Sequence, residues 1–478
     1  MSPLDPHLLQ QIVTALVATI TLGPALSGAL LGTLLVLGRP PSERVTARLV
    51  EWGSGVALLL SFALAGAWWI AGATPIPLHV GRLFEVRGYA YELGLLVDML
   101  SLTMLLITGL IVSFVARFSV HYLHRDPGYH RYFVLLSAFT VGMHLLVLAG
   151  SFDLLFVGWE IVGISSILLI AFFRERPGPV RGAVRAMVSY RVSDIGLLVA
   201  GILLHELSGT SEFTDAFGTG RWPVDSAHLS EGAATAVLLV LLVSVIGKSA
   251  QFPLGGWLPR AMEGPTPSSA LFYGALSVHA GVYLLLRAAP LLAISPVAST
   301  LVTLVGGVSA VWATASGRTR SDAKSAMAYA TITQVGLMLV AIGLGFYRWA
   351  LFHMAAHAVL RLWQLLRTPS ALHDARSIRA AIASTPGLRP SWIALALSEQ
   401  SLSKLYARAL HGFHVDDALN RFVVGPVLAA SRALDAFERR WEHKLAGQAA
   451  EACAAPAEPE ARHTKPKPER ARPLEEHP

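Results

Sequence analysis

A lysine at the end of a long apolar stretch is the first residue whose type and position suggest chemistry. Lys248 closes an apolar run and lies in the segment 247–269, which is rich in proline and glycine. A lysine at membrane depth is costly, and by default it marks an ion or proton path. The prolines and glycines predict a broken helix, which a membrane protein tolerates only where the backbone is buried in protein or lines a hydrated cavity.

Lysine is scarce in the apolar part of the chain. Before residue 400 the sequence contains only Lys248 and Lys324, although arginine is abundant. Arginine stays protonated in proteins, whereas a desolvated lysine can titrate. A GC-rich genome would produce the same bias, but a functional reason for the two remaining lysines is our main interpretation. Lys324 also fits a second interpretation, a lysine near a span end whose ammonium reaches the membrane interface.

Carboxylates within two other apolar runs are candidate partners. Glu160 lies inside one run, where an unpaired charge would cost several kcal/mol, so it needs a partner or a proton. We expect Lys248 to be that partner, as half of a proton relay, although the pair could also only fix two helices. Asp194 follows Arg191 by three residues, which places both on one helix face. They could form a purely local pair or belong to the path.

Histidines and an arginine share one face of the last long apolar run. His353, His357 and Arg361 are spaced by four residues, so their side chains point the same way. Histidines at this spacing can bind a metal. The sequence offers no nearby Glu or Cys ligand, and Arg361 would oppose a cation. A row of histidines that titrate near neutral pH is therefore better interpreted as part of a proton path, and we expect no metal or cofactor in this chain.

Histidine also occurs singly on apolar runs. His279 follows the broken segment and is equally compatible with a core histidine and with the path. His144 is interpreted as a core residue. The segment Gly247-Lys248-Ser249 is not a phosphate-binding loop, because position 242, where such a loop needs glycine, is leucine.

Composition places these residues in a membrane. Of 478 residues, 54% are apolar and 14% are charged, against about 25% charged in soluble domains. We therefore expect an all-α polytopic membrane protein. The net charge of +7 reflects arginines beside apolar runs, so nucleic-acid binding is not expected. We see no cleavable signal peptide, and the single Cys453 excludes disulfides from the fold.

Eleven apolar runs are long enough to cross a bilayer, which takes about 20 residues. They lie near 10–38, 50–73, 93–116, 132–149, 153–173, 184–206, 234–258, 267–288, 296–315, 325–346 and 348–367. Arginine-rich loops alternate with arginine-poor ones, one of them acidic with Glu212, Asp215, Asp225 and Glu231. The positive-inside rule then predicts an outside N-terminus and a cytoplasmic C-terminus.

The polar C-terminal part is expected to interact rather than to span. Residues 391–412 could form a short amphipathic helix or a weak twelfth span. Apolar residues then recur at helical spacing through 419–445, which predicts an amphipathic helix on the membrane surface or on a partner. From about Gly447 the composition predicts disorder.

Six motifs occur in order and together resemble one family. They are Val97-Asp98-Met99-Leu100-Ser101-Leu102, Gly158-Trp159-Glu160, Arg191-Val192-Ser193-Asp194-Ile195-Gly196, Gly247-Lys248-Ser249-Ala250-Gln251-Phe252-Pro253-Leu254, Gly264-Pro265-Thr266-Pro267-Ser268-Ser269-Ala270 and Lys324-Ser325-Ala326-Met327-Ala328-Tyr329-Ala330. The set is similar to the antiporter-like proton-translocating subunits of respiratory complex I and Mrp antiporters, specifically the L-type subunit. The resemblance covers roughly residues 93–367.

The resemblance implies two inverted repeats of five helices, each with a broken helix, and a proton path through them. Glu160, Lys248, Asp194, Lys324, His353 and His357 stand on the family's motif positions. The chain departs from the pattern at Tyr273, where the family usually has histidine, and at Arg361, where L-type members look to have lysine. We also expect it to lack the last spans and the long lateral helix of L-type subunits.

The segments 272–279 and 360–370 look like those of a truncated branch of the family. That branch implies the membrane subunit of the DAB inorganic-carbon pump, which would conduct H⁺ or Na⁺ to drive CO2 hydration by a large cytoplasmic zinc partner similar to β-carbonic anhydrases. On this hypothesis the chain is no enzyme itself and lies in the cell inner membrane. The alternatives are an L-type subunit of a complex I-like oxidoreductase or hydrogenase, and a free-standing cation/proton antiporter.

These interpretations predict four segments. Residues 1–92 would form N-terminal transmembrane helices, 93–367 the antiporter-like core, 368–446 an amphipathic cytoplasmic or partner-docking segment, and 447–478 a disordered tail.

Overall fold

The protein is mostly helical, and most of its long helices are built to cross a membrane. A computed structural model describes residues 6–86, 89–218, 222–223, 227–368 and 398–445. Within these ranges ten helical segments are long and apolar enough to span a bilayer. They comprise α1 (Pro6–Val36), α2 (Glu43–Ile70), α3 (Met99–Tyr122), α4 (Tyr129–Leu148), α5 (Phe152–Ile170), α6 (Pro177–Ser208), α8 (Glu231–Lys248), the segment from α10 (Thr266–Ser269) to α11 (Ala280–Arg287), α13 (Pro296–Gly317) and α14 (Ala323–Gly343).

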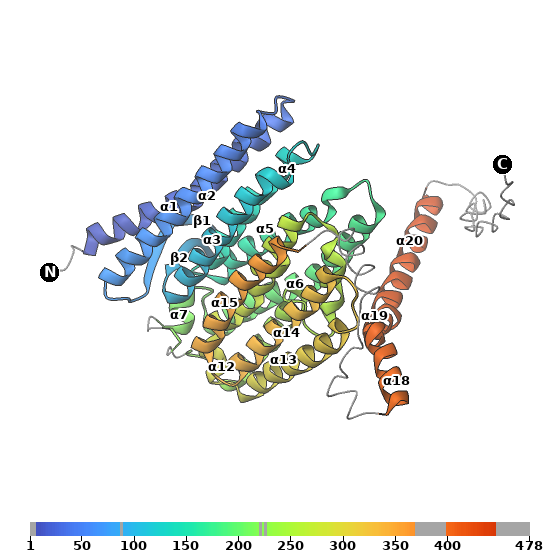
Figure 1. Cartoon of the computed structure of the whole chain (residues 1–478). Helices are drawn as coiled ribbons and strands as arrows, with labels where there is room; N and C mark the ends of the chain where they lie inside the picture. The colour runs from blue at the N-terminus through green and yellow to red at the C-terminus, as the bar shows by residue number, and fades with distance from the viewer. Residues whose placement is uncertain (1–5, 87–88, 219–221, 224–226, 369–397, 446–478) are drawn as a thin grey trace, which may run out of the picture. The chain divides into compact units, whose positions relative to one another are not determined.

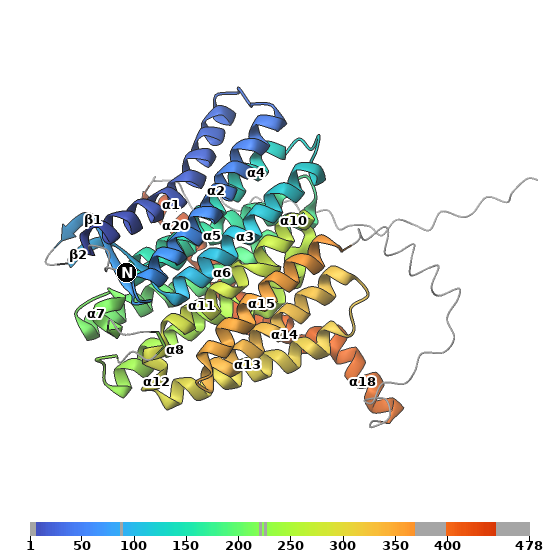
Figure 2. The same ribbon diagram turned by 60° about the vertical axis from the view of Figure 1, so that its left-hand side comes forward.

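The last of the eleven predicted runs forms a less apolar helix. Helix α15 (Tyr347–Leu366) has 20 residues but is not among the ten candidate spans. It carries Arg348, His353, His357 and Arg361, which lower its hydropathy. It packs against α14 and α3, and Figures 1 and 2 show it running alongside them. Each predicted run therefore corresponds to a helix, while the inverted-repeat relationship and the topology stay predictions.

A β-hairpin is the main departure from the expected all-helical chain. Strands β1 (Ile76–Val86) and β2 (Tyr89–Val97) pair antiparallel between α2 and α3. Gly150 N–H donates to the Gly94 carbonyl, and Phe213 N–H donates to the Gly150 carbonyl. These bonds tie the hairpin to the α4–α5 turn and to α7 (Phe213–Phe217). Figures 1 and 2 place the hairpin, α7 and α12 (Ala289–Ala293) at one end of the bundle.

The expected helix break lies directly after Lys248, where α8 ends. The freed polar groups find partners. The Trp257 indole N–H donates to the Gly247 carbonyl over 3.0 Å, and the Ser249 hydroxyl donates to the Val278 carbonyl over 2.7 Å. Ala250 adopts a positive φ of 54°, a conformation that costs energy for a residue with a side chain. The broken backbone is thus held in protein, as a non-helical segment at membrane depth requires.

The eighth predicted run is also irregular. Between α10 and α11 the chain forms a π-helical segment (Ala270–Ala275) and a 3₁₀ turn (Ser277–His279). Departures of this kind from regular α-helix often occur at functional sites. The run from Thr266 to Arg287 is the most deeply buried of the candidate spans.

The C-terminal part contains helices but no further candidate span among the described residues. Helix α18 (Glu399–Leu410) is a short amphipathic helix, which favours that alternative over a twelfth span. The chain divides after His414, and α19 (Val415–Leu419) and α20 (Gly425–Leu445) form a second unit. In α20 the apolar side chains of Leu434, Phe437 and Trp441 are exposed. The tail predicted to be disordered lies outside the described residues.

Packing of α5 against α4 depends on glycine beside the site. A Cβ built on Gly158 would lie 2.4 Å from the Leu146 backbone nitrogen, so the two helices could not keep their present distance. The next two residues along α5, Trp159 and Glu160, are candidates for function. The close contact of α5 with α4 at Gly158 therefore fixes the backbone positions from which the Trp159 and Glu160 side chains extend.

Gly158→Ala should lower stability by about 1–3 kcal/mol, because the added methyl overpacks a rigid backbone contact. Gly55→Ala is the matched control, since nothing lies within 4 Å of a Cβ there and alanine is the better helix former. Thermal unfolding of the detergent-solubilised protein measures both. Equal effects of the two variants would contradict this account of the α4–α5 contact.

Candidate functional site

The Lys248 ammonium is fully buried and forms no carboxylate ion pair within 4.0 Å among the described residues. Its Nζ donates to the Trp159 backbone carbonyl over 3.0 Å. It also lies 5.0 Å from the Trp159 ring centroid and 4.4 Å from that of Tyr190. Carbonyl and π contacts stabilise a cation less than a carboxylate would. Lys248 is therefore held by a carbonyl and two aromatic rings rather than by a direct ion pair among the described residues.

A glycine makes room for this ammonium. A Cβ on Gly163, one turn along α5 from Trp159, would lie 3.0 Å from Lys248 Nζ. Close contacts between α6 and α8 position the lysine from the other side. A Cβ on Gly247 would meet Ser193 at 2.7 Å, and the Ser193 hydroxyl donates to the Ser244 carbonyl over 2.6 Å.

Arg191 joins the two acidic candidates. Its Nη2 lies 2.7 Å from Glu160 Oε2 and 2.7 Å from Asp194 Oδ2. Asp194 is buried and also accepts a hydrogen bond from the Trp159 indole N–H over 2.8 Å. Trp159 thus connects the network, since its indole contacts Asp194 while its carbonyl accepts from Lys248. Glu160, Arg191, Asp194 and Lys248 form one cluster whose formal charges cancel.

The predicted direct pairing of Glu160 with Lys248 was wrong. Glu160 pairs with Arg191, which reaches it from α6, and the lysine bonds to a backbone carbonyl instead. The local pair of Arg191 and Asp194, which the three-residue spacing predicted, does form. The sequence could not show that one guanidinium serves both carboxylates, because Glu160 and Arg191 are 31 residues apart.

A second cluster lies on the far side of the helix break. His279 Nε2 and His357 Nδ1 are 3.0 Å apart, and both side chains are buried. Arg361 Nε donates to His357 Nε2 over 3.2 Å, and its Nη1 donates to Gln364 Oε1 over 2.8 Å. Two of the predicted path histidines and the arginine are therefore in direct contact.

These contacts assign the tautomers of the neutral histidines. Because arginine can only donate, His357 Nε2 must accept, and its hydrogen then lies on Nδ1. His357 consequently donates to His279 Nε2, so neutral His279 carries its hydrogen on Nδ1. The chain of donors runs from Arg361 through His357 to His279. A proton moving through the pair would have to reverse this order.

Buried hydroxyls lie between the two clusters. Tyr190, whose ring contacts Lys248, and Ser277, two residues before His279, both have side-chain oxygens without a hydrogen-bond partner among the described residues. Buried polar groups of this kind are normally satisfied by internal water. The region between Lys248 and His279 is thus polar enough to be hydrated.

Other predicted site residues lie apart from these clusters. His353 Nε2 bonds to Gln334 Oε1 over 2.9 Å, and its ring centroid is 6.4 Å from that of His357. Lys324 is half-buried at the start of α14 and forms no hydrogen bond or ion pair with the described residues. The side chain of Tyr273 is outside the described part. No group of three His, Cys, Asp or Glu residues that could hold a metal occurs among the residues searched.

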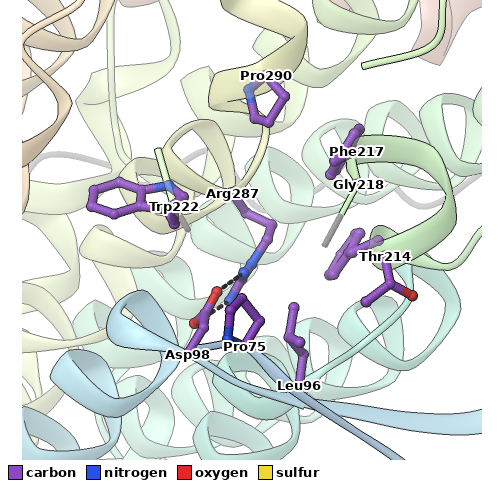
Figure 3. Close-up of a pocket in the computed structure, with 10 residues that line it drawn as sticks. Pro75, Leu96, Asp98, Thr214, Phe217, Gly218, Trp222, Arg287 and Pro290 are labelled. Atoms are coloured by element: carbon purple, nitrogen blue, oxygen red, sulfur yellow. Dashed lines mark hydrogen bonds and ion pairs between the residues drawn. The ribbon is translucent and has the colours of Figure 1, made fainter. Parts of the chain in front are cut away.

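The sequence analysis missed a second buried ion pair, between Asp98 and Arg287. Arg287 donates to both carboxylate oxygens of Asp98 and to the Tyr283 hydroxyl, the last over 2.9 Å. Asp98 also caps α3 by accepting from Ser101 N–H. Figure 3 shows the pair at the wall of a small cavity of about 30 Å³ beside Trp222 and Thr214. The sequence signal was the spacing of Arg287, eight residues after His279 on one helix face.

Comparison with known families places these clusters in context. The family described as NADH:quinone oxidoreductase/Mrp antiporter, TM, matches residues 149–398. The chain belongs to this family. A second family, described as NADH-Ubiquinone oxidoreductase (complex I), chain 5 N-terminus, matches residues 83–133. As a member of the NADH:quinone oxidoreductase/Mrp antiporter family, the chain has the multi-pass membrane fold that the apolar runs predicted.

Relatives include subunits of quinone oxidoreductases. NADH-ubiquinone oxidoreductase chain 5 of Allomyces macrogynus is 36% identical over 357 residues, covering 74% of this chain and 54% of the relative. Chloroplastic NAD(P)H-quinone oxidoreductase subunit 5 of Ipomoea purpurea is 34% identical over 331 residues, covering 68% of this chain and 47% of the relative. The family member described here therefore spans about half the length of these curated relatives.

Solved structures agree with the fold. The structure of the Mrp complex from Dietzia sp. DQ12-45-1b contains a similar chain, with a TM-score of 0.61 and 28% identity over 74% of this chain and 37% of that chain. A chain of the membrane-bound sulfane sulfur reductase, an archaeal respiratory membrane complex, has a TM-score of 0.58 and 21% identity over 73% of this chain and 70% of its own length. The second likeness concerns the fold alone.

Arg191→Gln should destabilise the protein by about 3 kcal/mol, because it leaves the buried Asp194 carboxylate without its cation. Arg439→Gln is the matched control, since Arg439 pairs with Asp435 on an exposed face of α20 and such pairs contribute about 0.3–0.5 kcal/mol. Thermal unfolding in detergent gives both values. A small effect at Arg191, equal to that at Arg439, would refute the proposed sharing of one guanidinium.

Proposed function

We propose that the chain is the proton-translocating, antiporter-like membrane subunit of a complex I-like or Mrp-type assembly. The observation that carries this proposal is the Lys248 ammonium, which is buried at a helix break and, among the described residues, contacts a carbonyl and two aromatic rings but forms no direct carboxylate pair. Simple stability does not explain such a lysine, because an apolar residue of similar volume would pack there at no electrostatic cost.

The proposed path begins at the charged cluster and continues through the histidines. Arg191 holds Glu160 and Asp194 beside Lys248, so a proton can leave the lysine while a carboxylate in the same cluster gains one. From Lys248 the path passes the Tyr190 and Ser277 hydroxyls to His279 and His357. His353, Arg361 and Lys324 extend the proposed path through the second half of the core. Lys324 would be connected to the histidines by a longer stretch of internal water.

Membership of a larger membrane assembly is part of the proposal. The relatives reported above are subunits of quinone oxidoreductases, and the similar structures come from multi-subunit membrane complexes. We propose that this chain likewise works with other subunits, carries no reaction chemistry of its own, and lies in the cell inner membrane with a cytoplasmic C-terminus. The amphipathic segment within 368–446 is the proposed docking region.

The inorganic-carbon pump is the second candidate. The features that favour it are the sequence of 272–279, with His279 in place of the family's earlier histidine, and Arg361 within 360–370. In that case the partner is a large cytoplasmic zinc protein that hydrates CO2. The relatives reported above favour the complex I-like alternative, so we rank the pump below it and the free-standing antiporter last.

Replacing Lys248 tests the transport function. Both Lys248→Met and Lys248→Arg should reduce proton flux at least about tenfold, the first because no titrating group remains and the second because arginine does not release its proton. The measurement is acidification of proteoliposomes that contain the assembled complex, with a pH-sensitive dye and an imposed membrane potential. Glu231→Gln, an exposed carboxylate at the start of the same helix, should leave flux unchanged.

The outcome of Lys248→Arg is the sharpest, because that variant keeps the positive charge. Full flux in this variant, with the Glu231→Gln control also active, would exclude Lys248 as a titrating member of the path.

Affinity purification of the full chain from its native membrane distinguishes the candidates. A complex I-like subunit should recover quinone oxidoreductase or antiporter subunits, identified by mass spectrometry. Recovery of a stoichiometric zinc protein with CO2 hydration activity would instead support the pump. A chain that purifies alone and still exchanges cations for protons in vesicles would support the free-standing antiporter.

A further inference from the structure

Polar residues form a buried stripe along α11 and the 3₁₀ turn just before it. His279, Tyr283 and Arg287 follow one another at intervals of four residues, and all three are at most 4% exposed. This spacing places them on one helix face, about 6 Å apart along the axis from one to the next. At one end of the stripe His279 contacts His357, and at the other end Arg287 binds Asp98.

The far end of the stripe borders a cavity that can hold water. Asp98 and Arg287 line a cavity of about 30 Å³ together with Thr214, Gly218, Pro75 and Trp222. A cavity needs only about 10–15 Å³ to hold one water if polar partners are present. The Arg287 Nε is buried and has no hydrogen-bond partner among the described residues. A water molecule in the cavity is a candidate acceptor for its hydrogen. Thr214 and Gly218 are partly exposed, which places the cavity close to the protein surface.

We propose that this stripe is a branch of the ion path that connects the histidine cluster to the aqueous phase at the hairpin end of the bundle. The inference rests on the proposed transport function and adds a route and a terminus to it. The predicted topology places this end outside. A proton released by His279 passes through internal water to the Tyr283 hydroxyl. That hydroxyl donates to the Val147 carbonyl over 2.7 Å, so it must turn away from Val147 to give up its own proton as it gains one. The proton it releases passes to the Asp98 carboxylate and then to cavity water. No oxidation or bond cleavage is involved.

Arg287 has a different role, because it stays protonated. Its guanidinium holds Asp98 and Tyr283 in place, and its positive charge opposes the entry of free cations through the cavity. It is therefore a positioning residue and an electrostatic barrier. While Asp98 and Arg287 remain in direct contact, the barrier to cations is in place. Water entering from the cavity would separate the two side chains and lower that barrier.

A structural brace is the competing explanation for the pair. A brace depends on having opposite charges at the two positions, whereas a conduit also depends on the Tyr283 hydroxyl and on the position of the carboxylate next to the cavity. Two variants separate these roles. Tyr283→Phe removes only a hydroxyl, and the exchange Asp98→Arg with Arg287→Asp keeps an ion pair while moving its carboxylate to α11.

The test is dye-monitored proton flux in proteoliposomes of the assembled complex, with thermal unfolding measured in parallel. Tyr283→Phe should lower flux at least about tenfold. Its unfolding midpoint should also fall, because the hydroxyl donates to the Val147 carbonyl over 2.7 Å and accepts from Arg287 over 2.9 Å, so flux is measured at a temperature below that midpoint, where the variant is folded. The control Tyr132→Phe removes another buried hydroxyl, which is bonded to Ser119 on α3 away from the stripe, and should keep full flux. The charge exchange should recover stability relative to Asp98→Asn without recovering flux.

Thiol labelling tests the terminus. In a Cys453→Ala background, Thr214→Cys should react with a charged methanethiosulfonate added to the hairpin side, and the bulky adduct should block flux. Asp215→Cys is the adjacent exposed control and should be labelled without loss of flux. Full flux in both Tyr283→Phe and labelled Thr214→Cys would overturn the proposed branch, as would flux that recovers fully in the charge exchange.

Lys248→Met serves as the reference in the same vesicles. If the native protein conducts and Lys248→Met does not, the transport function stands, and the stripe variants alone decide the branch. If the native complex conducts no protons, the transport function and the branch are both overturned.

Discussion

The structure depends on placing a lysine in the bundle without giving it a carboxylate. Lys248 could have been neutralised by a direct ion pair, and a path residue locked in this way would not exchange its proton. Arg191 prevents this by binding both Glu160 and Asp194. The lysine receives a carbonyl and two aromatic faces instead. The helix break, the glycines and the close approach of α5, α6 and α8 are the means by which this arrangement is held.

Charge balance explains why the cluster needs four members. Glu160, Asp194, Arg191 and Lys248 sum to zero, so the resting cluster adds no net charge to the low-dielectric interior. Loss of a proton from Lys248 leaves one negative charge in excess, which is costly at this depth. That cost falls if Glu160 or Asp194 takes up a proton in the same event.

The second cluster, formed by His279, His357 and Arg361, is different, because Arg361 supplies a positive charge beside two neutral histidines, and a proton arriving on His357 meets like charge. On the proposed path, Arg361 would therefore favour proton passage over proton storage.

Much of this could be predicted from the sequence, and the limits have physical causes. Hydropathy locates each helix because lipid imposes a length and a composition on every span. The break after Lys248 and the pair of Arg191 with Asp194 were predictable because both are local. Contacts between distant segments were not. The choice of Arg191 as the partner of Glu160, the contact of His279 with His357 across 78 residues, and the Asp98–Arg287 pair across 189 residues depend on how the helices pack. The hairpin was missed because its strands, of 11 and 9 residues, are too short to show the run of about 20 apolar residues by which hydropathy locates a span.

Irregular backbone occurs at one partner in several of the polar contacts. Lys248 lies at the end of α8, His279 in a 3₁₀ turn after a π-helical segment, and Asp98 at the cap of α3. A regular helix can direct a side chain only at fixed angular steps, and it satisfies its own polar groups. A broken helix leaves carbonyls such as those of Gly247 and Val278 to be bonded by side chains, so the backbone itself enters the polar network. The cost of breaking a helix in a membrane is thereby offset by bonds that also fix the lysine and the histidine in place. Irregular backbone therefore accompanies Lys248, His279 and Asp98, whereas Glu160, Arg191 and His357 reach their partners from regular helices.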